Sequence, residues 1–79
     1  MDFQGRPVLI TVHAVKRARE REIAYPDQVL DVLRTGKVTR FGKNGLKFVK
    51  KGKHGSIICL GEDLGHAIVI KTVERGELI

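Results

Sequence analysis

A histidine and three charged side chains recur at helical spacing in the segment HAVKRARER, residues 13–21. Because successive helical residues turn by about 100°, His13, Arg17, Glu20 and Arg21 would share about one third of a helix circumference, together with Ala24. An imidazole titrates near neutral pH and suits proton transfer, whereas the planar guanidinium group of arginine suits phosphate. These residue types would therefore suit a phosphate bound beside a proton carrier.

Metal-independent cleavage of RNA, which the family resemblance described at the end of this subsection implies, would need three kinds of group. A base takes the proton of the ribose 2′-OH, an acid protonates the 5′-leaving oxygen, and cations stabilise the charge that develops on the phosphoryl group. His13 is the proton carrier in this scheme, Arg17 and Arg21 hold the phosphate, and Glu20 either orients His13 or acts as base. Thr72 would position a phosphate oxygen if the last strand packs beside the helix. The candidate catalytic residues are therefore His13, Arg17, Glu20, Arg21 and Thr72.

The same cations also fit a purely structural role. Like charges four residues apart destabilise a helix by a few tenths of a kcal/mol per pair, and Glu20 can offset this for Arg17. Surface helices are commonly rich in Arg and Glu, and Arg17 and Arg21 can instead pair with Asp63 or Glu74 from the strands. From the residues alone, a phosphate site and a solvated, ion-paired face both remain open.

A second basic cluster lies at residues 47–54. On a strand, Lys47 and Lys51 share one face with Val49, while Phe48 and Lys50 share the other. Lysine acts as a point charge that suits phosphates rather than bases. The alternative is an edge strand that lysines protect against aggregation. The predicted nucleic-acid-binding residues of both clusters are Lys16, Arg17, Arg21, Lys47, Lys50, Lys51 and Lys53.

Composition agrees with a polyanionic partner, since the 79 residues carry a formal net charge of +6. No apolar run approaches the roughly 18 residues of a membrane span, and the first ten residues do not resemble a signal peptide. Cys59, the single cysteine, lies in an apolar run, which predicts a buried, inert thiol in the cytoplasm. His54 and His66 lie in glycine-rich loops without metal-ligand spacing, so we expect no metal and no cofactor.

Two helices are expected to carry the first cluster. A short strand at residues 8–10 leads to Thr11, whose hydroxyl would cap a helix over residues 12–24. Val12, Val15, Ala18 and Ile23 would form the core-facing side of this helix. Pro26 fits the first turn of a second helix, which Gly36 would end as a C′ residue.

Strand patterns follow from Lys37 onward. Residues 38–41 and 46–49 flank Asn44-Gly45, a strong hairpin-turn pair, and further strands are expected at residues 56–60 and 67–73. Phe41 and Phe48 would fill the core. The fold class predicted is α+β, with two N-terminal helices packed on an antiparallel β-meander of three to five strands. The chain forms a single domain over residues 1–79, with a core at about 8–75 and a tail at 76–79.

The helix motif also carries a resemblance. His13, Ala14, Arg17, Glu20, Arg21 and Ile23 resemble the HAxxRxxER helix of an uncharacterised bacterial family of small domains, and Thr72-Val73 resembles the end of its last strand. That family is similar to the barnase, EndoU, colicin and RelE-like superfamily of metal-independent ribonucleases, many of them toxins. The resemblance implies a RelE-like or barnase-like fold and RNA as substrate. In a protein-interaction role, the basic cluster would instead meet an acidic partner of the antitoxin type. The alternative is a non-catalytic nucleic-acid-binding or protein-interaction module that uses the same basic faces.

Overall fold

The structure, a computed structural model, describes residues 1–53 and 55–76. Its elements in chain order are β1 (Asp2–Phe3), β2 (Arg6–Ile10), α1 (Val12–Glu20), α2 (Asp27–Thr35), β3 (Lys37–Phe41), β4 (Gly45–Gly52), β5 (Gly55–Asp63) and β6 (Ile68–Gly76). The C-terminal tail predicted from residue 76 lies outside the described residues, except for Gly76, which ends β6.

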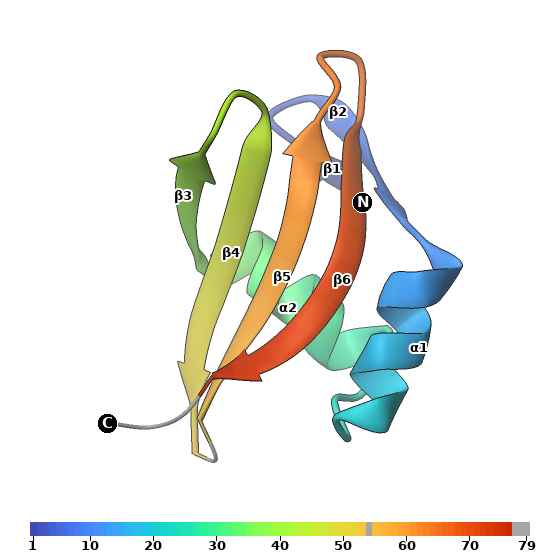
Figure 1. Ribbon diagram of the computed structural model, residues 1–79, viewed down its shortest axis with the longest axis vertical. Helices are drawn as coiled ribbons and strands as arrows, with labels where there is room; N and C mark the ends of the chain where they lie inside the picture. Colours follow the sequence, from blue (N-terminus) through green and yellow to red (C-terminus); the bar gives the residue numbers. More distant parts are fainter. Residues whose placement is uncertain (54, 77–79) are drawn as a thin grey trace.

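One six-stranded sheet forms most of the molecule, in the order β1-β2-β6-β5-β4-β3. It curls as a half-barrel. In the view of Figure 1, α2 lies behind the sheet and α1 lies beside β6. β2 runs parallel to β6, whereas the other neighbouring strands are antiparallel. The predicted fold class is therefore wrong. The sheet is larger than a three- to five-stranded meander, it is mixed, and two strands precede the helices.

The predicted hairpins from Lys37 onward are present within this sheet. β3, β4, β5 and β6 follow one another as antiparallel neighbours. Gly45 begins β4 opposite Phe41, and the turn precedes it, with Gly42 at φ 59°. A register shift follows between β5 and β6: Leu60 pairs with Thr72, whereas Gly61 pairs with Ile70. The extra residue opposite this step is Lys71.

Helix α1 begins at Val12 because Thr11 caps it, its hydroxyl accepting the backbone N–H of Ala14 at 3.1 Å. Thr11 also donates its own N–H to the carbonyl of Ile70 at 3.1 Å, which ties the start of the helix to β6. With the helix attached in this way, Ala14 and Ala18 face the core and are buried, while Val12 is 86% exposed. The predicted core side was therefore wrong at Val12. The helix also ends at Glu20, before the predicted Ala24.

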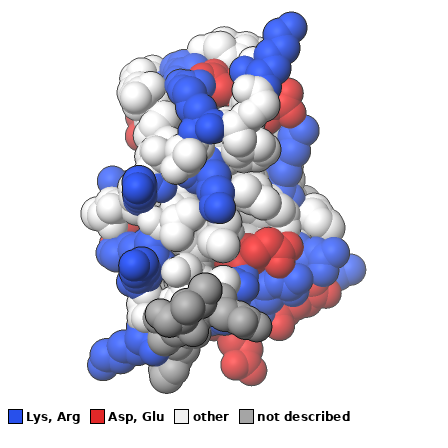
Figure 2. Space-filling model, turned by 60° about the vertical axis from the view of Figure 1, so that its left-hand side comes forward, with Lys and Arg blue, Asp and Glu red and all other residues white. Residues whose placement is uncertain are grey.

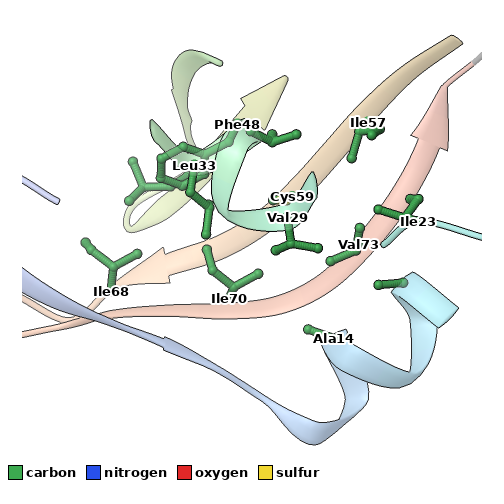
Figure 3. Packing of buried hydrophobic residues seen from close by; sticks show 13 residues of the cluster. Ala14, Ile23, Val29, Leu33, Phe48, Ile57, Cys59, Ile68, Ile70 and Val73 are labelled. Atoms are coloured by element: carbon green, nitrogen blue, oxygen red, sulfur yellow. The ribbon is translucent and has the colours of Figure 1, made fainter. Parts of the chain in front are cut away.

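Helix α2 covers the middle of the sheet. Val29, Val32 and Leu33 are buried on it, and Figure 3 shows Leu33 near Phe48 and Val29 near Cys59 within the buried cluster. Burial of this kind contributes about 25 cal/mol for each Å² of apolar surface removed from water. The helices and sheet therefore enclose one apolar layer between them.

Gly36 ends α2 differently from the prediction. Its φ is −72°, so it is extended rather than left-handed, and its N–H still bonds to the carbonyl of Val32. A Cβ at this position would lie 2.5 Å from the carbonyl oxygen of Val32 and 2.9 Å from that of Val49. The glycine is needed for close packing of the chain against β4, and not for its φ angle.

Candidate nucleic-acid interface

The predicted helix cluster is arranged around Arg17. Its Nε donates to Nε2 of His13 at 3.4 Å, and its Nη1 lies 3.4 Å from Oε1 of Glu20. All three side chains are on the solvent side of α1, with His13 and Glu20 exposed. Glu20 thus contacts Arg17 and not His13 among the described hydrogen bonds. A phosphate held by Arg17 would therefore have an imidazole and a carboxylate as neighbours.

Arg21 links this cluster to the last strand. Its Nε donates to Oε2 of Glu74 at 2.6 Å, and Oε1 of the same carboxylate accepts the hydroxyl of Thr72 at 3.1 Å. The ion pair that the sequence left as an alternative for Arg21 is thus present with Glu74. Asp63, the other carboxylate considered, pairs instead with Arg6 and Arg40.

The carboxylate of Glu74 is stabilised electrostatically by two arginines. Its partial burial raises the pKa of the carboxyl group, but hydrogen bonds from Arg21 and Thr72 and the charges of Arg21 and Arg17 outweigh this, so the pKa lies below its ordinary value. The charge of Arg17 therefore acts on the same carboxylate that Arg21 binds. In this way the helix cluster and the Thr72–Glu74 pair form one polar site.

Thr72 and Glu74 lie on the face of the sheet away from the helices. They pair with Leu60 and Ile58 of β5, whereas the alternating residue Val73 is buried in the core. We call this uncovered surface the open face, and its residues are Thr39, Phe41, Lys47, Ile58, Leu60, Thr72 and Glu74. The polar site thus lies where the end of α1 meets the open face.

The open face is hollowed along its length. One hollow of about 520 Å³ has Phe41, Leu60 and Glu74 in its wall, and a second of about 530 Å³ continues past Leu60 to Lys71 and the β3–β4 turn. Figure 2 brings the β3 edge of the sheet forward and shows Lys and Arg side chains on both sides of uncharged surface. A chain lying in these hollows would reach Glu74 and, through it, Arg21.

The predicted basic residues do not all share this surface. Lys47 lines the open face, and Lys51 follows it on the same side of β4. Lys50 points to the helix side, where its ammonium group binds Asp31 of α2. Lys16 and Lys53 are exposed, and the described hydrogen bonds and salt bridges include no contact between either of them and the polar site.

The edge-strand alternative for these lysines fails at Lys47. β3 pairs with β4 from Gly45 to Val49, so Lys47 lies in an inner strand. The exposed edge of the sheet on this side is β3 itself, all five residues of which are exposed. Protection of an edge therefore does not explain Lys47, which faces an open hollow.

Two members of the surface were missed by sequence reasoning. Glu74 was considered only as an ion-pair partner, although its spacing of two from Thr72 places both on one face of a strand. Phe41 was expected in the core, yet it is 48% exposed, whereas Phe48 is fully buried. The signal for Phe41 was weak, because the alternation of β3 does not say which face the helices cover.

Other candidate groups lie apart from this site. Cys59 is buried, which raises the pKa of its thiol to about 12 and keeps it protonated. His66 is exposed, and His54 lies outside the described residues. Among the residues that the structure describes, no three His, Cys, Asp or Glu side chains gather as metal ligands, and no helix is long and apolar enough to cross a membrane.

Comparison with known proteins found no family model, curated protein or solved structure that matches the chain. The resemblance drawn from the helix motif therefore stays a hypothesis. The case for a function rests on the polar site and the hollows beside it.

Proposed function

We propose that this chain binds single-stranded RNA and cleaves it without a metal ion, at the polar site formed by α1 and β6. The observation that carries the proposal is the link from Arg21 through Glu74 to Thr72, which joins the His13–Arg17–Glu20 cluster to the hollowed open face. A strand bound in the hollow would bring one phosphate to the arginines. The net charge of +6 favours such a polyanion.

The contacts of Arg17 suggest which residue acts as base and which as acid. Arg17 would hold the scissile phosphate, with Glu20 on one side as base and His13 on the other as acid. To act as acid, His13 must carry a proton on Nε2, so the bond that Arg17 Nε donates to this atom has to be released when the phosphate binds. Glu20 takes the proton of the 2′-OH as the 2′-oxygen forms its bond to phosphorus. The bond from phosphorus to the 5′-oxygen then breaks, and that oxygen takes its proton from His13. The products are a 2′,3′-cyclic phosphate and a 5′-hydroxyl.

Incubation of the purified chain with end-labelled RNA in EDTA tests the cleavage directly. Wild type should cut, and the new ends should carry 2′,3′-cyclic phosphates. His13→Ala should slow cleavage by about 10²–10⁴-fold while leaving RNA affinity nearly unchanged. His66→Ala is the matched control, since it removes an exposed histidine away from the site. Equal cutting by His13→Ala and wild type would remove His13 from the mechanism.

One observation favours a second function, that of a binding module without catalysis. Arg21 is already bound to Glu74. The imidazole of His13 and the carboxylate of Glu20, which would transfer the protons, both contact Arg17 and do not contact each other in the described hydrogen bonds. In that case wild type would bind RNA but leave it intact, in solution and on ribosomes, and His13→Ala would behave like wild type. An acidic antitoxin-type protein, which the basic cluster would also suit, would compete with RNA for the same cations.

A further inference from the structure

Phe41 occupies an unusual position for the side chain of an edge strand. It lies opposite Gly45 in the β3–β4 ladder, and a Cβ on that glycine would lie 2.6 Å from Cε2 of the phenyl ring. The phenyl ring therefore packs on the backbone of Gly45. Any other residue at position 45 would place a Cβ atom where the ring now lies. Packing against the glycine holds one side of the ring, while the side chain remains 48% exposed.

The surroundings of the ring are apolar at the centre and basic at the margin. Phe41 and Leu60 line both hollows of the open face, and Ile58 lies beside them. Lys43 and Lys47 also line the hollows, and the described salt bridges include no partner for either.

The carboxylates of the same surface are already neutralised. Glu62 binds Lys71, and Glu74 binds Arg21. The hollows therefore present a flat aromatic ring with unopposed positive charge beside it. This combination is complementary to a single-stranded nucleic acid, in which flat bases alternate with phosphates.

We infer that Phe41 is a base-stacking residue, on which an unpaired base of the RNA rests while Lys47 meets an adjacent phosphate. The inference rests on the proposed function and adds the path of the substrate to it. Phe41 and Glu74 line the same hollow, so a strand stacked on Phe41 continues to Glu74 and Arg21. An acidic peptide would use the lysines but would have no use for a flat ring.

The absence of tryptophan from the chain provides a direct probe. Phe41→Trp introduces a single tryptophan, and its emission should be quenched when a base stacks on the indole. The ligand is a 2′-O-methyl RNA decamer, which has no free 2′-OH and so cannot be cleaved by the proposed chemistry. An oligonucleotide of the same length with abasic positions carries the same phosphates and should cause no quenching. Tyr25→Trp, on the exposed connection between the helices, is the control for a nonspecific effect.

Affinity gives a second, independent readout by fluorescence anisotropy with the same decamer. Phe41→Leu keeps an apolar side chain but loses the flat ring, so affinity should fall by roughly fivefold or more, while Phe41→Tyr should stay within about twofold of wild type. Thermal unfolding checks that each variant is folded.

The outcomes separate the inference from the proposed function. If wild type binds and cleaves RNA, but Phe41→Leu binds as well as wild type and Phe41→Trp is not quenched, the stacking role is overturned and the cleavage stands. If quenching and the affinity loss occur without any cleavage by wild type, stacking stands and catalysis falls. Equal quenching by polyglutamate and by the decamer would overturn base stacking in favour of an acidic protein partner.

Discussion

Nε of Arg21 lies 2.6 Å from Oε2 of Glu74, so the residue after α1 is tied to a residue of β6 that lies 53 positions further along the chain. The contact reaches past the edge of β6 to the open face of the sheet, where Thr72 bonds to the same carboxylate. It holds together the two parts of the polar site. The same pair also competes with a phosphate for Arg21.

The Arg21–Glu74 pair should contribute modestly to stability. Both side chains are about one third exposed, at 32% and 34%, so solvent screens much of the attraction. In a double-mutant cycle with Arg21→Ala and Glu74→Gln, urea unfolding should give a coupling energy of about 0.5–1 kcal/mol. Arg19→Ala, an exposed position on α1, should show no coupling to Glu74→Gln. Additive effects of Arg21→Ala and Glu74→Gln would contradict the contact.

RNA binding should depend on salt through the helix arginines. Each phosphate contact contributes about 0.7 to the slope of log affinity against log salt for single strands. The double variant Arg17→Ala/Arg21→Ala should therefore lower the slope by between about one and two, measured by anisotropy at several salt concentrations. Arg19→Ala/Arg34→Ala removes the same charge from exposed positions elsewhere and should leave the slope nearly unchanged. An unchanged slope in both doubles would move the RNA site away from α1.

Asp63 should make stability depend on acid. The N–H of Gly65 is the main cause of its lowered pKa, burial opposes the shift, and Arg6 and Arg40 add to the lowering. Because the folded pKa is below the unfolded value of about 3.9, the stabilisation is present above about pH 4 and is lost as pH falls through the folded pKa.

Asp63→Asn should therefore lower Tm at pH 7, and its difference from wild type should shrink below pH 4. Thermal unfolding across this range measures the effect, with Asp2→Asn, at an exposed position of β1, as control. A difference that stays constant from pH 7 to pH 2 would show that the ionised carboxylate is not the cause.

The rotation of α1 can be tested at two positions. Ala14 is fully buried, so Ala14→Leu should overpack the contact with β6 and destabilise the fold by about 1–3 kcal/mol. Val12 is 86% exposed, so Val12→Ala should change stability by less than about 0.5 kcal/mol. The helix face expected from the sequence alone would give the reverse order in chemical denaturation.

Local signals in the sequence were the reliable ones. Thr11 as a cap and the strand alternation after Lys37 are short-range features, and the structure contains both the cap and the antiparallel neighbours. The helical spacing of Arg17 to His13 and Glu20 also predicted side chains that do contact Arg17. Each of these depends on residues close together in the chain.

Apart from the end of α1 and the conformation of Gly36, the errors concern long-range contacts. Nothing near Val8 indicates that its strand pairs in parallel with Ile68, and this pairing creates the six-stranded sheet. The orientation of Ala14 toward the core depends on the bond from Thr11 to Ile70. Which face of the sheet stays uncovered, and so whether Phe41 is exposed, depends on where both helices pack. These features depend on how the strands and helices pack together, and not on the local conformational preferences of the residues.

The parallel pairing of β2 with β6 has a consequence for the order of assembly during synthesis. A ribosome makes Arg6–Ile10 and α1 well before their partner strand Ile68–Gly76, because α2 and the strands β3 to β5 come between them. The β3–β4 and β4–β5 hairpins can form locally, whereas β2 and α1 can pack onto β6 only after β6 has been made, and this closure costs the entropy of a long loop. Arg21 meets Glu74 only after that closure, so a nascent chain carries no finished site.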